Sequence, residues 1–291
     1  MTLFDRVITA KDLKEKEDFQ NGNEWIVKDI IPRGAGGLVV APSKSFKSSM
    51  TLSMAMSIAD GKKWAGHDTR KSNVLIIDNE DTDFTLHQRL NAYNEVPDGL
   101  SFVTGGIFKL DNRNHMNGLY KHIIDNDVKV VILDNLKDML EDENTLNDMS
   151  AMNKVLGGIT KLKLLLNDVT FILVAHARKA VEEDSLTDKN FRVRSSHALG
   201  SSAIGAWFEF CLTMSPKINS KSQNRYSIMR VEARNFAFSD EMLWGYVGDT
   251  FLHLDPAKKE KPKLIQDEEE KTGDTFLEVA KQEGKVNEIN D

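Results

Sequence analysis

The sequence predicts an α/β fold, a mostly parallel sheet flanked by helices with antiparallel strands at its C-terminal end. Short apolar runs alternate with longer segments of helical character, which is the pattern of a parallel α/β sheet. The runs are continuous in Val, Ile and Leu, as expected of strands that helices cover on both faces. After about residue 205 the pattern changes to alternating apolar and polar residues, which favours antiparallel strands.

Four parallel strands and one clear helix follow from these patterns. The strands are predicted at residues 37–41, 74–78, 128–134 and 170–176. Between the last two strands, leucine and isoleucine recur every three or four positions, the spacing of a helix with one apolar face. The recurring residues are Leu156, Ile159, Leu162 and Leu166. In the C-terminal part we expect strands at residues 226–231 and 243–254, the second interrupted by a hairpin turn at Gly248 and Asp249.

The composition is that of a folded globular chain. Of the 291 residues, 40% are apolar and 29% are charged, which excludes disorder throughout. We expect an N-terminal arm at residues 1–24, one main domain at residues 25–256, and a charged linker with a short tail at residues 257–291. The net charge of −7 argues against a general polyanion binder but allows a local basic loop that contacts nucleic acid.

The sequence indicates a cytoplasmic protein without a membrane partner. It contains no apolar run of the roughly 18 residues that a membrane-spanning helix needs, and its charged N-terminus does not resemble a signal peptide. The single cysteine, Cys211, cannot form an intrachain disulfide and lies in an apolar run. We therefore expect it in the core rather than at a nucleophilic site.

A phosphate-binding loop is predicted where the first strand ends. A strand, a loop of small residues, Lys-Ser and a helix start form a context in which backbone N–H groups and a helix N-terminus surround a phosphate. The predicted nucleotide-binding residues are Ala41, Pro42, Ser43, Lys44, Ser45, Phe46, Lys47, Ser48 and Ser49. The strict motif has glycine in place of Ala41 and Phe46, so we expect the phenylalanine to require a different backbone solution. Taken alone, the motif also fits a surface loop that caps a helix.

Polar residues mark the ends of the next three predicted strands. The carboxyl ends of parallel strands meet at one edge of a sheet, so these residues are expected to converge on the loop. Asp134 suits Mg²⁺ binding together with Ser48, Glu80 suits a general base for an attacking water, and His176 suits a sensor of the γ-phosphate. The alternatives are an exposed turn acid for Glu80, a helix cap for Asp134 and a hydrogen-bonded core residue for His176.

Six segments occur in an order and spacing that are specific for one protein family. They are WIVKDIIPRG at 25–34, VLIIDNEDTDFTLHQRL at 74–90, VILDNL at 131–136, ILVAHARK at 172–179, RSSHALGSSA at 194–203 and MRVEARN at 229–235. In these segments the chain resembles the RepA-like AAA ATPases, RecA-fold relatives of the DnaB-type hexameric replicative helicases. The resemblance implies a RecA-like P-loop NTPase core over residues 25–256, with Glu80 as its catalytic glutamate and Asp134 at the end of its Walker B strand.

The resemblance also implies cofactors and an assembly. It implies an ATPase that uses ATP and Mg²⁺ and forms a homo-oligomeric ring, expected to be a hexamer, in which Lys47 neutralises the β- and γ-phosphates. Arg234 matches the position from which related helicases supply an arginine to the neighbouring subunit's γ-phosphate. In DnaB-type relatives a lysine lies two residues before that arginine, whereas this chain has Glu232. The alternative for Arg234 is a surface cation paired with Glu232 or Asp240.

The long segment between His176 and Trp207 is predicted to contact single-stranded DNA. It is poor in large apolar residues, and irregular segments of this length are uncommon unless they are functional. The candidate DNA-binding residues are Arg178, Lys179, Arg192 and Arg194. The resemblance implies that such loops line the channel of a ring translocase, where cations bind backbone phosphates. The segment also contains four acidic residues, so a solvated surface loop is the alternative.

The sequence therefore predicts an ATP-dependent motor that acts on DNA, a phage- or plasmid-type ring helicase that translocates on single strands. A second interpretation of the same fold is a phage recombination or annealing ATPase that coats single-stranded DNA without unwinding it. A third is a degenerate module that binds nucleotide, or nothing, and serves in assembly.

Overall fold

The structure is a computed structural model, and it describes residues 7–15, 24–179, 181, 188, 190–200, 202–218, 225–235, 241–247 and 250–254. The expected hairpin turn at Gly248 and Asp249 and the expected linker and tail at residues 257–291 lie outside these ranges. Within the expected N-terminal arm, the described residues form a short helix, α1 (Ala10–Lys14), that has no buried residue.

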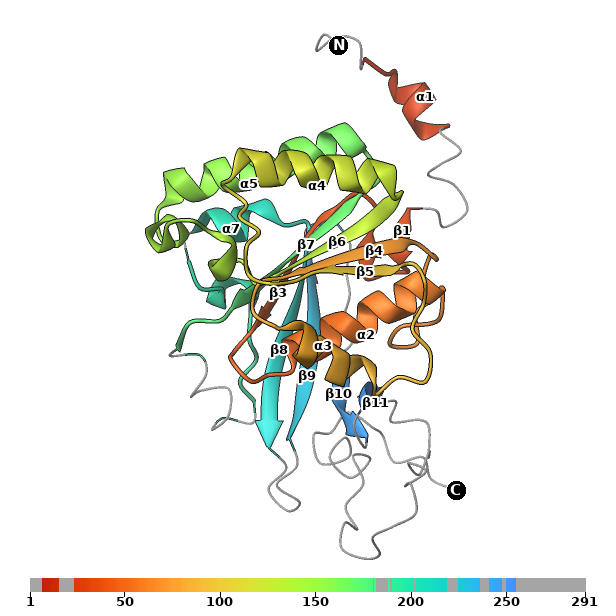
Figure 1. The fold of residues 1–291 in the computed structure, drawn as a ribbon, viewed down its shortest axis with the longest axis vertical. Helices are drawn as coiled ribbons and strands as arrows, with labels where there is room; N and C mark the ends of the chain where they lie inside the picture. The colour runs from red at the N-terminus through yellow and green to blue at the C-terminus, as the bar shows by residue number, and fades with distance from the viewer. Residues whose placement is uncertain are drawn as a thin grey trace, which may run out of the picture.

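The described part of the chain contains a nine-stranded mixed sheet in the order β11-β10-β9-β8-β3-β7-β6-β4-β5 (Figure 1). Its strands are β3 (Gly36–Ala41), β4 (Asn73–Asp78), β5 (Leu100–Val103), β6 (Val128–Asp134), β7 (Thr170–His176), β8 (Phe210–Ile218), β9 (Arg225–Ala233), β10 (Met242–Val247) and β11 (Thr250–Leu254). The strands from β5 to β8 in this order run parallel to their neighbours, and those from β8 to β11 run antiparallel. The predicted fold class is confirmed, and each predicted parallel strand begins and ends within one residue of its observed bounds.

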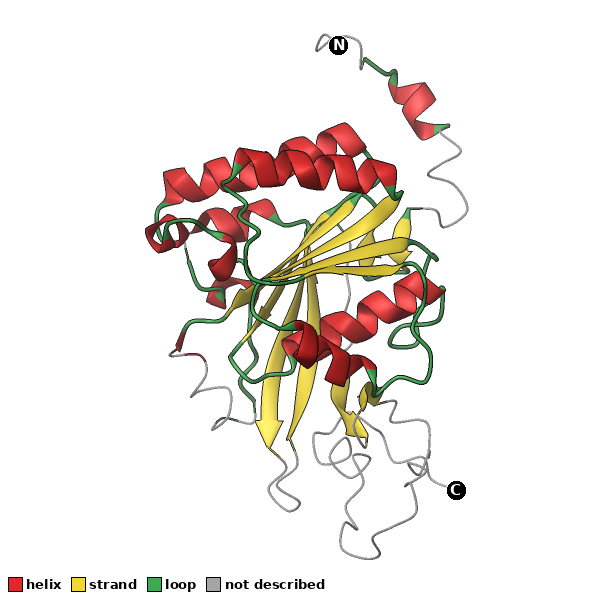
Figure 2. Ribbon diagram, viewed as in Figure 1, coloured by secondary structure: helices red, strands yellow, loops and turns green. Residues whose placement is uncertain are grey.

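Helices cover both faces of this sheet (Figure 2). On one face lie α2 (Lys47–Asp60) and α3 (Asp83–Leu90), and on the other lie α4 (Arg113–Asp125), α5 (Met149–Leu166) and α7 (Ser202–Trp207). The helix predicted from the leucine spacing is α5. Short 3₁₀ helices occur at η3 (Lys137–Met139), η4 (Glu143–Leu146) and η5 (Ser195–His197). A separate antiparallel pair, β1 (Trp25–Val27) and β2 (Ile31–Pro32), precedes the main sheet.

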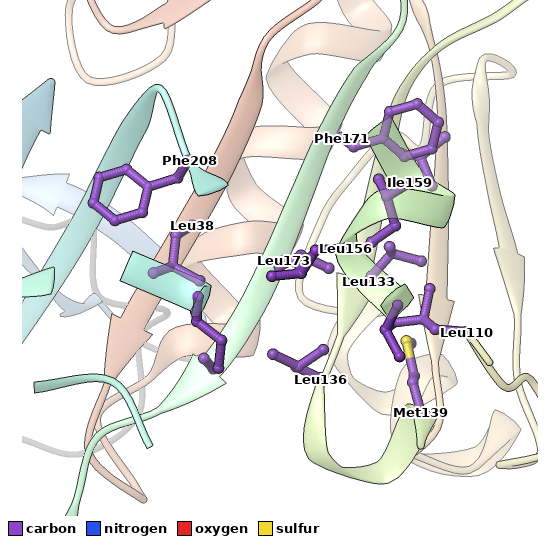
Figure 3. Close-up of a cluster of buried hydrophobic side chains, with 14 of the residues drawn as sticks. Leu38, Leu110, Leu133, Leu136, Met139, Leu156, Ile159, Phe171, Leu173 and Phe208 are labelled. Carbon is purple, nitrogen blue, oxygen red and sulfur yellow. The ribbon is translucent and has the colours of Figure 1, made fainter. Parts of the chain in front are cut away.

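Side chains of the central strands alternate between two cores, one on each face. On β3, Leu38 belongs to the core beneath α5 and Val39 to the core against α2. Figure 3 shows the first of these cores, in which Leu173 from the sheet and Leu156 and Ile159 from α5 form part of one buried cluster. Because both faces of the sheet are covered, the central strands are continuous apolar runs rather than alternating ones.

The central strand β8 was not predicted from the sequence. It is parallel to β3 and antiparallel to β9, so the sheet changes direction at this strand. Its buried positions include Thr213, Ser215 and Lys217, which interrupt the apolar run. The Nζ of Lys217 donates to the carbonyl oxygens of Asp188 and Phe191 at 2.7 and 3.0 Å. These partners are distant in sequence, so no local pattern reveals that the lysine is buried.

Candidate functional site

The carboxyl ends of four parallel strands lie at one edge of the sheet (Figure 1). The register of β3 with β7 places Ala41 opposite His176, and the register of β4 with β6 places Asp78 opposite Asp134. Each strand continues from this edge into a loop or a short connection to a helix. The predicted site residues therefore emerge side by side, as the sequence led us to expect.

Two direct contacts join four of these residues. The side chain of Lys47, at the start of α2, is buried, and its Nζ lies 3.6 Å from Oε2 of Glu80. The Oγ of Ser48 donates a hydrogen bond to Oδ2 of Asp134 at 2.8 Å. A lysine, a hydroxyl and two carboxylates from three different segments thus form one continuous polar cluster.

The backbone of the phosphate loop reaches α2 through Phe46 in a left-handed conformation, with φ of 67° and ψ of 23°. Lys44 also has a positive φ, of 57°. This corrects the expectation that the phenylalanine would require a different backbone solution, because Phe46 adopts a conformation that glycine favours. A left-handed conformation costs a residue other than glycine about 1–2 kcal/mol. The Phe46 side chain packs against the core on the α2 face, which offsets part of this cost.

A hydrogen-bond relay fixes the middle of the same loop. The Oγ of Ser45 donates to the carbonyl oxygen of Pro42 at 2.6 Å, and the Oγ of Ser227 on β9 donates to the carbonyl oxygen of Ser45 at 3.0 Å. Ser45 and Ser227 are both buried. The loop leads directly into α2, whose N-terminal N–H groups are suited to binding an anion.

The surroundings of Asp134 fit a divalent cation. In the described part of the chain, its Oδ1 atom is buried and has no hydrogen-bond partner. Complete burial raises the pKa of Asp134 to about 7, although nearby Lys47 acts in the opposite direction. A hard cation is a natural partner for such an oxygen. Among the described residues, no group of three or more His, Cys, Asp or Glu side chains could hold a metal ion. Ser48 and Asp134 are the residues of the cluster that could hold Mg²⁺.

Glu80 is half-exposed beside this cluster, on the loop that follows β4. The loop turns sharply because Oδ1 of Asp78 accepts hydrogen bonds from the backbone N–H groups of Glu80 and Asp81, both at 2.8 Å. Partial burial raises the pKa of Glu80, but Lys47, a hydrogen bond from Asn135 and nearby His176 together outweigh this effect and lower it. Glu80 is therefore ionised at neutral pH, as a general base must be.

His176 lies at the end of β7, beside the phosphate loop, and its side chain is partly buried. Burial, followed by the positive charge of Lys47, lowers the pKa of its imidazole. The ring is thus neutral at pH 7 and has one donor and one acceptor nitrogen. A neutral imidazole at this place is able to donate a hydrogen bond to a phosphate oxygen.

Arg234 lies far from these residues, at the end of the sheet where the parallel strands begin. Ala233, the last residue of β9, pairs with Phe210 at the start of β8, and Phe210 pairs with Gly37 at the start of β3. The exposed Arg234 side chain donates from Nη2 to the carbonyl oxygens of residues 205 and 206, at 3.2 and 2.7 Å. The structure therefore does not bring Arg234 to the site of its own chain.

The alternative pairing of Arg234 with Glu232 is not observed, since Glu232 has another partner. Its carboxylate accepts hydrogen bonds from the Oγ of Ser195 at 2.5 Å and from the Ser195 N–H at 3.3 Å. Asp240, the other candidate partner of Arg234, lies outside the described residues.

The candidate DNA-binding residues divide into two groups. Arg178, Lys179 and Arg194 are exposed. Arg192 is mostly buried, and its Nε donates to Oε1 of Glu241 at 2.9 Å. Three of the four predicted cations are therefore directed at solvent, while the fourth is held in an ion pair within the domain.

Two residues that contact the cluster or its phosphate loop were not predicted from the sequence. Asn135, directly after Asp134, donates from Nδ2 to Oε2 of Glu80 at 2.9 Å. An asparagine after a strand usually suggests a turn, so only its position beside Asp134 could have indicated a role. Ser227 was missed because it lies 182 residues from its partner Ser45, and no local pattern connects them.

Two further expectations from the sequence concern Cys211 and membrane-spanning helices. Complete burial raises the pKa of the Cys211 thiol well above its usual range, which agrees with a core residue and not with a nucleophile. None of the helices in the described ranges combines the length and apolar character that crossing a bilayer requires.

Comparisons with known proteins identify a matching family and similar folds. A family model described as an AAA domain (AAA_25) matches residues 9–182. The fold is similar to a solved structure described as an ATPase domain, with a TM-score of 0.61 and 12% identity over 84% of this chain and 97% of that one. It is also similar to the KaiC-like protein PH0186 from Pyrococcus horikoshii OT3, with a TM-score of 0.56 and 14% identity over 79% of this chain and 94% of that one. A search of curated protein sequences gave no significant match. The RecA-like fold class is thereby confirmed.

Proposed function

Because the chain belongs to the AAA domain family AAA_25, we propose that the cluster at the end of β3 binds and hydrolyses ATP with Mg²⁺. The observation that carries this proposal is the hydrogen bond of Ser48, at the start of α2, to Oδ2 of Asp134. The other carboxylate oxygen of Asp134, Oδ1, is buried and has no partner in the described residues. This is the arrangement that a nucleotide-bound Mg²⁺ requires from a P-loop protein.

Each residue of the cluster has a distinct task in this proposal. Lys47 releases Glu80 and neutralises the β- and γ-phosphates, while the loop and the N-terminus of α2 bind them through backbone N–H groups. Ser48 and Asp134 would hold Mg²⁺, which when bound neutralises charge that develops on the phosphate oxygens. Glu80 takes a proton from the attacking water, and His176 senses the γ-phosphate by a hydrogen bond.

We further propose that the site is completed by Arg234 of a neighbouring copy in a homo-oligomeric ring, with six subunits as the resemblance implies. The exposed side chain and its position at the opposite edge of the sheet support a role in trans, because Arg234 cannot reach its own nucleotide. Mass measurement of the purified chain with and without ATP tests the assembly. A monomer under both conditions would contradict it.

For the biological role we favour a phage- or plasmid-type helicase that translocates on single-stranded DNA in the cytoplasm. The motif resemblance and the exposed cations Arg178, Lys179 and Arg194 support this role. A recombination or annealing ATPase remains the second candidate, and a non-catalytic assembly module the third.

One set of measurements separates these candidates. ATP hydrolysis with and without single-stranded DNA is measured for the wild type and for Glu80→Gln, followed by displacement of a forked duplex and annealing of complementary strands. We expect DNA-stimulated hydrolysis, a loss of about 100-fold or more in kcat for Glu80→Gln, and retained ATP binding. Displacement supports the helicase and annealing without displacement the second candidate. A wild type that does not hydrolyse ATP would refute the enzymatic proposal.

A further inference from the structure

Asn135 has every strong hydrogen-bonding group of its side chain engaged. Its Nδ2 donates to Oε2 of Glu80 at 2.9 Å and to Oδ2 of Asp138 at 2.7 Å, and its Oδ1 accepts from the backbone N–H of Asp138 at 3.2 Å. The side chain is almost fully buried, with 1% of the residue exposed. An amide donates two hydrogen bonds through Nδ2 and accepts through Oδ1, so this network is complete.

The network permits a single orientation of the amide. A backbone N–H can only donate, so the atom that faces the Asp138 N–H must be the amide oxygen. The reversed amide would also direct Oδ1 at two carboxylates, those of Glu80 and Asp138. Asn135 therefore directs an N–H group at Glu80, and its amide has only this orientation.

The two loops that carry these residues are joined by hydrogen bonds from the backbone and the side chain of Asn79. The N–H of Asn79 donates to the carbonyl oxygen of Asp134 at 2.9 Å, and Nδ2 of Asn79 donates to the carbonyl oxygen of Asp138 at 3.0 Å. Glu80 follows Asn79, and Asn135 follows Asp134. The donor and acceptor of the Asn135 contact are thus placed by neighbouring residues that are themselves fixed to one another.

Lys47 contacts the same carboxylate oxygen, at 3.6 Å, but its role differs. In the proposed function the ammonium of Lys47 moves to the phosphates once nucleotide binds, which weakens its hold on Glu80. The side chain of Asn135 is buried and bonded at both ends, so it has no comparable alternative partner. After Lys47 has turned to the nucleotide, Asn135 is the contact that still fixes Oε2.

We propose that Asn135 is a positioning residue that holds the Glu80 carboxylate toward the attacking water, an inference that rests on the proposed function. With Oε2 bonded to Asn135, Oε1 is the oxygen that accepts the proton of the water. The water oxygen then forms its bond to the γ-phosphorus, the bond from that phosphorus to the β-γ bridging oxygen breaks, and ADP leaves with the bonding electron pair. Asn135 exchanges no proton in this step and acts only by fixing the base.

The test uses two variants of Asn135 and a matched control. Asn135→Asp keeps the shape of the side chain but replaces the N–H donor by an acceptor, and Asn135→Ala removes the contact. The control is Thr170→Ala, at the amino end of β7, which removes a buried side chain that accepts from the Gly34 N–H and donates to the Pro32 carbonyl oxygen, at 2.9 and 3.1 Å. The other charged groups near Glu80 are unchanged in all three variants: Lys47, Asp78, Asp81, Asp134, Asp138 and His176.

Two readouts separate positioning from a general structural effect. The first is kcat and KM for ATP as a function of pH, and the second is the titration of the Glu80 carboxyl by ¹³C NMR, assigned by its loss in Glu80→Gln. We expect kcat to fall about 10- to 100-fold in both variants with KM changed less than about threefold. The pKa of Glu80 should rise in Asn135→Ala and rise further in Asn135→Asp, while Thr170→Ala leaves kcat and the titration as in the wild type.

The possible failures are distinguishable. A wild-type kcat in both Asn135 variants would overturn the positioning role, whatever the titration shows. An unchanged Glu80 titration in both variants would overturn it as well, even with reduced kcat, because the loss would then arise elsewhere. If the wild type does not hydrolyse ATP at all, the proposed function fails together with the catalytic role of Asn135, and the NMR titration still decides whether Asn135 holds Glu80.

Discussion

Ser227 on β9 donates a hydrogen bond from its Oγ to the carbonyl oxygen of Ser45 in the phosphate loop, at 3.0 Å, and both residues are buried. The antiparallel strand β9 is thereby attached directly to the nucleotide site, although two strands, β8 and β3, separate it from β7, the nearest of the strands that end in His176, Asp134 and the Glu80 loop. At its other end the same strand leads to Arg234. The strand β9 thus connects the loop of one site to the arginine proposed for the next.

Ser227→Ala should weaken ATP binding. Removing a buried hydrogen bond to the loop costs about 1 kcal/mol, which corresponds to roughly a fivefold increase in Kd. We expect kcat to change less than Kd, because no reacting group is removed. Equilibrium binding of a fluorescent ATP analogue measures the effect. Thr213→Val on the adjacent strand is the control, since the Thr213 Oγ1 is buried with no partner in the described residues. Equal affinities in wild type and Ser227→Ala would contradict this role.

Phe46 provides a direct measure of backbone strain in the loop. Phe46→Gly and Phe46→Ala remove the same ring packing, but in the left-handed conformation seen at φ of 67° only the alanine has the steric cost of a Cβ atom. We expect Phe46→Gly to exceed Phe46→Ala in free energy of unfolding by about 1 kcal/mol. Urea denaturation of both variants measures this difference. Equal stabilities would show that the loop carries no such strain.

The strands that frame the site were predictable because both of their faces are buried. Continuous apolar runs reveal strands covered on both faces, and the residues that follow such runs must lie at one edge. This pattern predicted the positions of Glu80, Asp134 and His176. It failed at β8, whose buried Lys217 is stabilised by backbone carbonyl groups from a distant loop.

The contact of Asn135 with Glu80 and the backbone conformation of Phe46 depend on contacts between distant segments, which a local sequence pattern does not show. Asn135 was visible beside Asp134, but its function depends on the meeting of two loops 55 residues apart. The conformation of Phe46 was predicted incorrectly for a related reason. The sequence shows that a favourable glycine is missing, whereas it does not show that packing against the α2 core holds the phenylalanine in the same conformation.

The buried Asp134 predicts an unusual pH dependence of stability. Its pKa is about 7 in the folded chain and near 3.8 when unfolded, so between these values the folded state binds more protons. The contribution of Asp134 to the free energy of unfolding therefore decreases as pH rises, by about 1.4 kcal/mol per pH unit within this window. In metal-free buffer the wild type should lose stability relative to Asp134→Asn between pH 5 and pH 7. Saturating ADP and Mg²⁺ should flatten this difference, because a bound cation favours the ionised carboxylate. A pH-independent difference without nucleotide would contradict the assignment.

Exposed cations after β7 predict salt-dependent binding of single-stranded DNA. The double variant Arg178→Ala, Lys179→Ala should weaken binding of oligo-dT and reduce the slope of log K against log salt by about 1.4, or about 0.7 for each lost phosphate contact. The control is Lys121→Ala, Lys161→Ala, which removes the same charge from exposed positions on α4 and α5. If both double variants weaken binding equally, only net charge matters and the loop is not the DNA site.

Arg234 is best tested by complementation between two inactive chains. Glu80→Gln lacks the base but retains the arginine, whereas Arg234→Ala retains the base but lacks the arginine. If Arg234 acts in trans, each variant alone should lose about 100-fold or more in kcat, and mixing them should restore hydrolysis. In a random equal mixture about one quarter of the subunit boundaries combine an intact Glu80 with an intact neighbouring Arg234, so activity should approach that fraction of wild type. Arg230→Ala, which removes an exposed arginine from β9, the strand that precedes Arg234, controls for charge. Normal hydrolysis by Arg234→Ala alone would remove the arginine from the mechanism. If Arg234→Ala is inactive but the mixture remains inactive as well, the arginine does not act across a subunit boundary.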